Sequence, residues 1–455
     1  MYCTTKSRRR LREELVALLE EEIDRLLGSM EQAEVPPTLE HLENDILAAV
    51  FRLGQALLQQ CVDLIGPGRS AEDPQCECGG PTEFQRYQVK MVLTLLGLIH
   101  VRRAYYTCGQ CHHGIAPLDR QLRLDKTGLS GGLQNALCRT LARMPFAEAV
   151  QFLKSFHYPE VPETTVRRLA KQVGGELCQA QRQVVEESWA KTEPPPMEVE
   201  EAPLRLYVSM DGTKIHLQRG WAEIRLGAVY ETEEVPKADG GVAIRTIKPS
   251  YLPYLGDVDT FGRLVYIEAA RRGLEQAAEV IILGDGAEWI WRQARKICPE
   301  AVFIVDWWHA TEHLWEAARA LFGEGSDEAE SWEELRETEL WEGQVEQVIA
   351  ALRQAQPPDE EAQETIQEQI TYFTNQKDRM RYDEYRACGY QIGSGTVESA
   401  CGRVIGQRLK QAGMIWSEEQ AMAVSQIRAA LLDGRWPAFW KARQPPLRRH
   451  RRKAA

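Results

Sequence analysis

Two short apolar runs in this sequence each end in an aspartate. Val280–Leu283 leads through Gly284 to Asp285, and Ala301–Val305 leads directly to Asp306. Such runs indicate buried strands of an α/β sheet, and open α/β sheets hold their sites at the carboxyl edge. A carboxylate beside a core is costly unless something pairs with it. A helix N-cap is one explanation for Asp285, and a bound cation is another.

Two further acids belong to the same predicted sheet domain. Asp211 ends, or lies within, an expected strand at Leu206–Thr213, and Glu398 falls in the first turn of a helix that Ile392–Ser399 opens. The helix dipole alone favours a carboxylate there. Mg²⁺ prefers oxygen ligands, and two such ions about 4 Å apart can drive phosphoryl transfer. Asp211, Asp285 and Glu398 are therefore candidate ligands of catalytic Mg²⁺ or Mn²⁺.

Four cysteines form a second chemical pattern, as two close pairs on either side of an expected strand pair at Val89–Tyr106. Two thiolate pairs at the ends of a β hairpin can supply all four ligands of a tetrahedral, structural Zn²⁺. Four free buried thiols are the alternative. The pairs are Cys76 with Cys78 and Cys108 with Cys111, and His112 or His113 could replace one ligand.

The elements that must position these residues divide the chain into five expected segments. The α/β assignment rests on strands and helices that begin as an antiparallel set and finish as a parallel one. The third strand of the α/β domain is expected at Tyr251–Leu255. A helix over Asp257–Arg271, which Gly262 could break, is expected to follow it. The segments are 1–68, a helical hairpin for packing or dimerisation; 69–127, a zinc-binding β module; 128–200, a helical region and linker; 201–434, the α/β domain with an all-α insertion at about 324–390; and 435–455, a basic, loosely ordered tail.

The helical region before the linker resembles a helix-turn-helix in its pattern. Phe146–Phe156 is the first expected helix, and Glu163–Gln183 is the second, which Thr164–Thr165 would cap. Arg167 and Arg168 lie in its first turns, where a recognition helix contacts DNA. A helix pair with no DNA role has the same pattern, so both explanations stay open.

The charge distribution differs from the total charge. A net charge of −12 is not typical of a nucleic-acid binder, but local patches decide such contacts. Arg435–Lys453 carries eight Lys/Arg and no acidic residue, and the helix of Glu398 carries a basic stripe. Arg403, Arg408 and Lys410 make up that stripe and are predicted to contact phosphate.

The composition predicts a cytoplasmic protein. No run of eighteen apolar residues is present, and the basic N-terminus is followed by an amphipathic pattern instead of a signal peptide. Eleven cysteines, an odd number in a long chain, do not suggest a disulfide framework, which favours a reducing compartment.

Several of these segments together resemble the DDE transposases of bacterial insertion sequences, above all the Kra-type family, with kinship to the Mutator-like group. The resemblance covers roughly residues 70–430. The matching catalytic segments are Asp211-Gly-Thr, Leu283-Gly-Asp285-Gly, Asp306-Trp-Trp-His309 and Gly393-Ser-Gly-Thr-Val-Glu398. The matching N-terminal segments are Cys76-x-Cys78-Gly-Gly, Arg103-Ala-Tyr-Tyr-Thr-Cys108-x-x-Cys111 and Pro117-Leu-Asp119.

The resemblance implies a ribonuclease-H-like α/β catalytic domain with an all-α insertion, preceded by helical, zinc-ribbon-like and helix-turn-helix-like modules. It makes Asp211, Asp285 and Glu398 the catalytic triad, and Asp306 with His309 the near-site pair of the D-x-x-H signature. It further implies double-stranded DNA as substrate, a homodimer or higher oligomer, and a place near the bacterial nucleoid.

Two other functions use the same residues. A non-catalytic, zinc-containing DNA-binding regulator derived from a transposase explains the cysteines and the basic tail but not three intact acids. A ribonuclease-H-like nuclease that cuts without joining shares the whole triad. A strand-transfer assay on the element's own ends separates joining from cutting.

Overall fold

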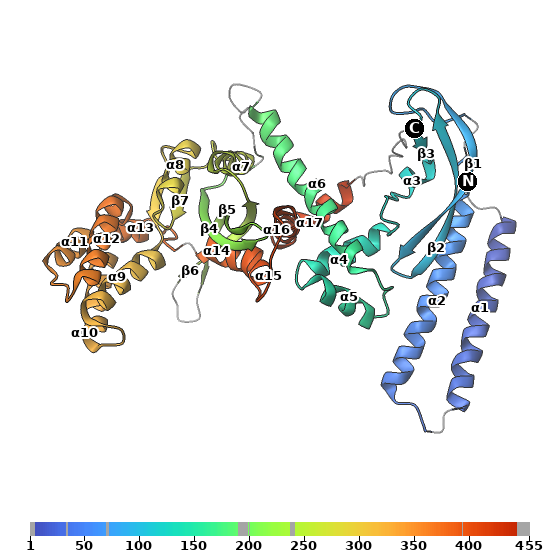
Figure 1. Cartoon of the computed structure of the whole chain (residues 1–455), viewed down its shortest axis with the longest axis horizontal. Helices are drawn as coiled ribbons and strands as arrows, with labels where there is room; N and C mark the ends of the chain where they lie inside the picture. The colour runs from blue at the N-terminus through green and yellow to red at the C-terminus, as the bar shows by residue number, and fades with distance from the viewer. Residues whose placement is uncertain are drawn as a thin grey trace. The chain divides into compact units, whose positions relative to one another are not determined.

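The computed structural model describes residues 5–32, 35–69, 72–189, 199, 201–236, 242–393 and 395–443. It consists of two compact units, one formed by residues 1–170 with 437–455 and the other by residues 171–436. The elements are labelled in Figure 1. Within the described residues, no helix is long and apolar enough to cross a membrane.

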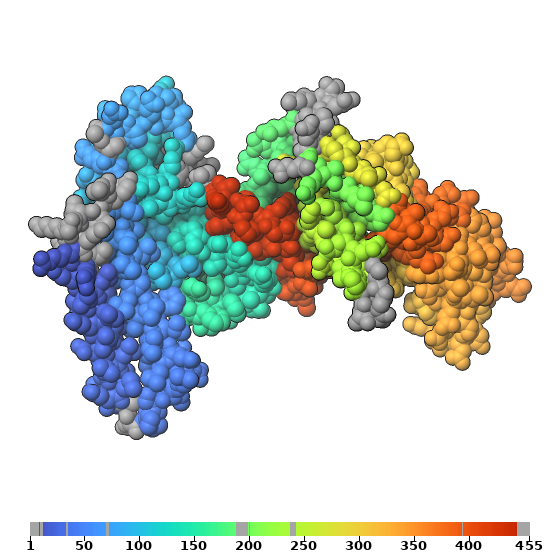
Figure 2. Space-filling view, turned by 180° about the vertical axis from the view of Figure 1, so that it is seen from behind, coloured from blue at the N-terminus to red at the C-terminus, as the bar shows by residue number. Residues whose placement is uncertain are grey.

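The first unit begins with two long helices, α1 (Thr5–Glu31) and α2 (Leu39–Ile65), which lie side by side (Figures 1 and 2). The hydroxyl of Thr38 caps α2 by accepting a hydrogen bond from the His41 N–H. The buried Glu22 carboxylate joins the two helices through an ion pair with Arg52 at 2.7 Å. The predicted hairpin is therefore present.

The long hairpin of β1 (Thr82–Thr94) and β2 (Gly97–Cys108) packs against α2. The strands pair antiparallel from Thr82 opposite Cys108 to Thr94 opposite Gly97, and the short β3 (Gly114–Ile115) adds to β2. Alternate residues face a core of Val62, Val92, Ile99, Val101, Leu118 and Leu124.

Helices complete this unit: α3 (Pro117–Gln121), α4 (Gly131–Leu141), α5 (Phe146–Ser155) and the start of α6 (Glu163–Trp189). The prediction that Thr164–Thr165 caps α6 is wrong, because the helix already begins at Glu163 and both threonines lie inside its first turn. The tail is also not loosely ordered throughout, since Trp436–Ala442 forms helix α17. Residues 444–455 lie outside the described part.

The second unit is built on a five-stranded mixed sheet, so the chain is a mixed α/β protein. The strand order is β6-β5-β4-β7-β8, antiparallel among β4, β5 and β6 and parallel from β4 through β7 to β8. The first three strands are longer than the sequence suggested. The strands are β4 (Arg205–Leu217), β5 (Gly220–Pro236), β6 (Val242–Tyr254), β7 (Glu279–Gly284) and β8 (Val302–Val305).

Helices connect and cover these strands. Asp257 caps α7 (Val258–Arg271), which Gly262 does not break. That glycine is instead a point of close packing, because a Cβ there would lie 2.1 Å from Gln293 of α8 (Glu288–Ile297). The helix α9 (Trp307–Phe322) follows β8 directly. The second half of α6 packs through Val185 on α7.

An all-helical insertion follows α9, as predicted, and Figure 1 shows it gathered beyond that helix. It comprises α10 (Asp327–Trp341), α11 (Val345–Gln354), α12 (Glu360–Gln376), the 3₁₀ turn Lys377–Arg379 and α13 (Tyr382–Ala387). The chain then returns to the sheet through α14 (Gly395–Ala400), a π-helical turn at Cys401–Gly406, α15 (Gln407–Leu409) and α16 (Glu418–Leu432).

Candidate functional site

Three aspartates lie in or directly after three neighbouring strands of the sheet: Asp211 within β4, Asp285 after β7 and Asp306 after β8. The parallel ladder of β4 and β7 ends at Ser209 opposite Leu283, two residues before Asp211 and Asp285, whose charges interact. The ladder of β7 and β8 ends at Gly284 opposite Val305, and Asp285 and Asp306 are the residues that directly follow this last pair. The carboxyl ends of parallel strands thus gather acids that lie far apart in the sequence.

Asp285 is not the N-cap of α8. The cap position is Ala287, and the Asp285 carboxylate accepts a hydrogen bond from the Ala287 N–H at 2.8 Å, which closes a tight turn. Gly286 makes that turn possible with a φ of 107°. The side chain stays half-buried at the mouth of the site.

Asp306 is a true N-cap. Its carboxylate is fully buried and accepts a hydrogen bond from the His309 N–H at 2.9 Å at the start of α9. The same carboxylate oxygen lies 3.1 Å from His309 Nδ1. Asp306 therefore fixes both the helix start and the imidazole.

His309 lies among carboxylates. Its Nδ1 is 3.5 Å from Glu398 Oε1, and Asp306, His309 and Glu398 each offer a ligand atom within 4.8 Å of the others. The hydrogen bond to Asp306 raises the pKa of His309 to about 9, against the effect of burial, and the charges of Asp285 and Glu398 add to the rise. These interactions favour the protonated form of the ring, which offsets part of the surrounding negative charge.

The surroundings of Asp211 disfavour its charged form, whereas those of His309 favour the charged ring. Burial raises its pKa, and the negative charge of Asp285 adds to this, while hydrogen bonds from the Cys401 thiol and the Gly212 N–H work against it. Glu398 approaches from α14, which packs against β4 and β5. The structure thus gathers all five predicted acidic and histidine residues in one region, although the tight group holds Glu398 with Asp306 and His309, without Asp211 or Asp285.

The four predicted cysteines also come together, in the first unit. Cys76 Sγ lies 3.4 Å from Cys111 Sγ, Cys78 Sγ lies 3.6 Å from Cys108 Sγ, and all four sulfurs fall within 4.8 Å of one another. Those separations exceed a disulfide bond of about 2.05 Å. They fit tetrahedral zinc, where Zn–S bonds of about 2.3 Å place sulfurs roughly 3.8 Å apart. The four cysteines could therefore hold a zinc ion.

Backbone geometry builds this cluster. Pairing of Thr82 with Cys108 brings both cysteine pairs to one end of the β1–β2 hairpin. The N–H groups of Gln110 and Cys111 point at Cys108 Sγ and help lower the pKa of that thiol to about 6. A Cβ at Gly80 would lie 3.0 Å from the same sulfur. Of the two candidate histidines, His113 is close, with Nδ1 3.5 Å from Cys111 Sγ.

The predicted phosphate contacts divide into exposed and buried residues. Arg167 and Arg168 are exposed on α6, and Arg167 pairs with Glu163 and covers the Phe146 ring at 4.6 Å. Arg403 and Lys410 are exposed as well. The prediction for Arg408 is wrong.

Arg408 is fully buried, so it is not accessible to a phosphate. Its guanidinium lies 4.8 Å from the centre of the Trp416 ring and donates a hydrogen bond to Met414 Sδ. Helical spacing explains the difference, because a residue five positions after Arg403 lies about 140° around an α-helix from it, whereas Lys410, seven positions after, lies on nearly the same side.

The sequence did not identify two residues of the insertion that hold the Asp285 turn. The Tyr372 hydroxyl donates to the Asp285 carbonyl at 3.1 Å, and Gln376 Nε2 donates to the Gly286 carbonyl at 2.8 Å. Both lie on α12, far along the chain, and no local pattern marks them.

A comparison with known protein families identifies one that matches most of the chain. Residues 38–442 match the uncharacterised protein family UPF0236, and the chain belongs to that family. No curated protein matches it.

Proposed function

We propose that this chain is a DDE-type transposase, which cleaves and joins DNA at the ends of a bacterial insertion sequence. One observation carries the proposal: Asp211 in β4 lies close enough to Asp285, directly after β7, for their charges to interact, and Glu398 on α14 lies 3.5 Å from His309, whose pKa also responds to Asp285. The antiparallel-then-parallel sheet and the all-α insertion before α14 support a ribonuclease-H-like fold for the second unit.

The donor set suits divalent cations that prefer oxygen. Asp211, Asp285 and Glu398 offer carboxylate oxygens, and the raised pKa of Asp211 marks a buried carboxylate whose charge needs compensation. When bound there, Mg²⁺ or Mn²⁺ would activate the attacking hydroxyl and stabilise the leaving oxygen of a phosphodiester.

His309 is assigned a positioning role in this proposal. Its Nδ1 lies 3.1 Å from Asp306 and 3.5 Å from Glu398, so the protonated ring attracts the Glu398 carboxylate and offsets part of the negative charge. Asp306, as the buried cap of α9, fixes the ring that does so.

The other modules complete the proposal. The four cysteines hold a structural zinc ion, while Arg167, Arg168, Arg403, Lys410 and the tail bind phosphates of double-stranded DNA. Paired cleavage of two ends requires a homodimer or a larger assembly. The protein works beside bacterial DNA in the cytoplasm.

The test is Asp285→Asn, assayed for cleavage and strand transfer on the element's own ends with Mg²⁺ or Mn²⁺. Asparagine can still accept the hydrogen bond from Ala287, so the turn and the thermal stability should persist. Cleavage should fall by roughly three orders of magnitude or more, because a charged ligand is lost. Binding to the ends should remain.

Asp257→Asn is the matched control, since it makes the same change at the cap of α7, away from the site. It should cleave at the parental rate. If Asp285→Asn also cleaves at the parental rate, the transposase proposal is wrong. Cleavage by the parent without any joined product would identify a nuclease instead.

A further inference from the structure

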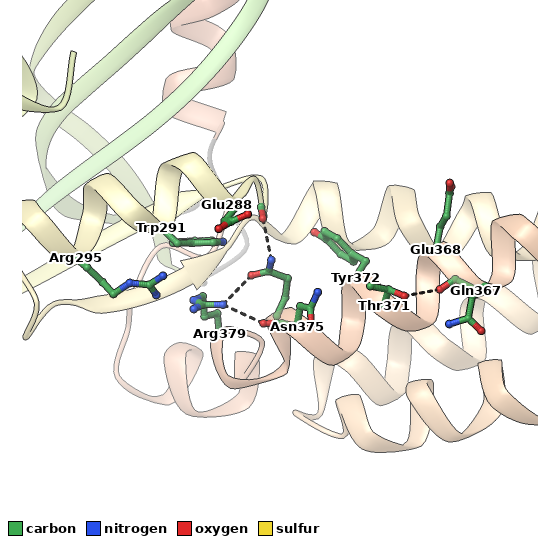
Figure 3. Close-up of a pocket in the computed structure, with 11 residues that line it drawn as sticks. Glu288, Trp291, Arg295, Gln367, Glu368, Thr371, Tyr372, Asn375 and Arg379 are labelled. Atoms are coloured by element: carbon green, nitrogen blue, oxygen red, sulfur yellow. Dashed lines mark hydrogen bonds between the residues drawn. The ribbon is translucent and has the colours of Figure 1, made fainter. Parts of the chain in front are cut away.

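A cavity of about 640 Å³ lies between α8 and α12 in the second unit. That volume falls within the range of about 300–1,000 Å³ typical of ligand sites. Gly286, the residue after Asp285, forms part of its wall, and Figure 3 shows the lining side chains. The cavity therefore adjoins the turn that carries a proposed catalytic acid.

Two guanidinium groups meet at one end of this cavity. Arg295 comes from α8 and Arg379 from the 3₁₀ turn after α12, and Figure 3 shows them turned toward one another below the Trp291 ring. Among the described residues, neither arginine forms an ion pair. Burial and the neighbouring charge of Arg295 lower the pKa of Arg379. Glu288 also lines the cavity and the charge of Asp378 acts on Arg379, but neither carboxylate forms an ion pair with these arginines. Two guanidinium groups held together in this way can bind an anion.

A third donor in the cavity wall has no partner. Trp291 is 3% exposed, and its Nε1–H makes no hydrogen bond within the described structure. Arg379 covers the indole ring at 4.9 Å. A buried donor left unpaired is costly, so a ligand oxygen that reached the buried Nε1–H would relieve that cost.

The opposite end of the cavity is different in character. Gln367 offers an amide group there, and Figure 3 shows the Glu368 carboxylate directed away from the arginines. The cavity therefore has one end with two guanidinium groups and another end with an amide and a carboxylate. A nucleotide has a matching division between its phosphate and its base.

Hydrogen bonds connect the cationic end to the site. Arg379 donates to Gln376 Oε1 at 3.0 Å, and Gln376 in turn donates to the carbonyl of Gly286. A ligand that holds Arg379 would therefore also hold the turn that positions Asp285.

We propose that this cavity binds a phosphate group of a nucleotide unit, through Arg295, Arg379 and the Nε1–H of Trp291. The phosphate would belong to a DNA strand or to a free nucleotide. The idea that a DNA strand supplies this phosphate rests on the proposed function, whereas the anion site itself does not.

The experiment measures binding of a labelled, 5′-phosphorylated thymidylate hexamer to the full chain, without divalent cations, by fluorescence anisotropy. Arg295→Gln should weaken binding roughly tenfold, the usual effect of losing one charge-assisted hydrogen bond. Arg292→Gln is the matched control, because Arg292 is also exposed on α8 but does not line the cavity. Its affinity should stay within about twofold of the parent.

Trp291→Phe provides a second variant that keeps the ring and removes the unpaired donor. Its hexamer affinity should fall while its thermal stability stays at or above that of the parent. Competition by thymidine monophosphate distinguishes the two sources. If thymidine monophosphate displaces the hexamer from the parent, and Arg295→Gln weakens that displacement, the phosphate belongs to a free nucleotide. If thymidine monophosphate fails to displace the hexamer, the phosphate belongs to a DNA strand.

Equal losses in Arg295→Gln and Arg292→Gln would overturn the cavity proposal, because they would mean only general charge attraction. Unchanged affinity in both variants would overturn it as well. A parent that binds through Arg295 but never cleaves DNA would refute the transposase proposal and leave the cavity proposal intact.

Discussion

Each acid at the strand edge has a different role in the folded chain. Asp306 caps a helix and orients His309, Asp285 closes a turn, and Asp211 lies inside a strand with its charged form disfavoured by burial. The residue type alone predicts a cap or a metal ligand equally well. Local hydrogen bonds separate the two roles, because a cap must accept from the first turn of its own helix.

A second buried acid, Glu333 in α10, predicts a pH dependence of stability. It is 2% exposed with one carboxylate oxygen unpaired, and burial, with the charges of Glu337 and Glu334, raises its pKa to about 7. Between about pH 4.5 and pH 7 the folded chain holds a proton that the unfolded chain has lost. Stability should therefore fall as pH rises through that window.

Glu333→Gln removes the cost of ionising this buried carboxyl. The melting temperature of the variant should match that of the parent near pH 4.5 and exceed it by several degrees at pH 8. About 1 kcal/mol shifts the Tm of a domain this size by roughly 2–4 °C. Calorimetry at both pH values measures the difference. Glu364→Gln, an exposed change on α12, should show no such dependence on pH. Equal Tm values for Glu333→Gln and the parent at pH 8 would contradict the prediction.

At the scale of elements, helix α12 of the insertion supports the turn of Asp285. Gly286 has a φ of 107°, and a Cβ there would lie 2.7 Å from the Tyr372 ring. The helical insertion thus serves the sheet directly through Tyr372 and Gln376, and not merely as a spacer before α14.

Gly286→Ala should destabilise the chain by about 2–4 kcal/mol, through both backbone strain and the clash with Tyr372. Gly323→Ala measures the backbone strain alone, because Gly323 has a similar φ of 88° and an added Cβ there would meet no atom within 4 Å. Urea unfolding of the two variants gives the comparison. Equal losses would show that the contact with Tyr372 contributes nothing.

The cysteine cluster at the end of the β1–β2 hairpin predicts about one zinc ion per chain by elemental analysis. Cys108→Ser should lower both zinc content and thermal stability, because zinc binding contributes folding free energy. Cys61→Ser, at an exposed cysteine outside the cluster, should change neither. Unchanged zinc content in Cys108→Ser would exclude the assignment.

At the scale of the whole molecule, a net charge of −12 coexists with basic segments. Favourable DNA contact must then come from local patches, and its affinity must depend on salt through the release of counterions. Among the residues proposed to contact phosphate, Arg403 and Lys410 are exposed, and the tail residues Arg448–Lys453 lie outside the described part.

DNA affinity should therefore fall steeply as salt rises, and Arg403→Gln should flatten the logarithmic slope by roughly one unit. Removal of residues 444–455 should flatten it further. Arg353→Gln, an exposed change on α11, should leave the slope unaltered. Affinity that does not vary with salt would disprove phosphate contact by these segments.

The sequence by itself determined the features that depend on short-range patterns. The apolar runs before Asp285 and Asp306, the cysteine pairs around a hairpin and the all-helical insertion all appear in the structure where they were expected. Periodicity and local spacing suffice for these, because strands and helices bury one face in a regular repeat.

Only the tertiary structure decided which residues meet. Arg408 is buried against Trp416, and the insertion brings Tyr372 and Gln376 onto the Asp285 turn. The cavity between α8 and α12 joins Arg295 to Arg379 across a long stretch of chain. Such contacts follow from how distant elements pack, and the local pattern around each residue carries no information about its distant partner.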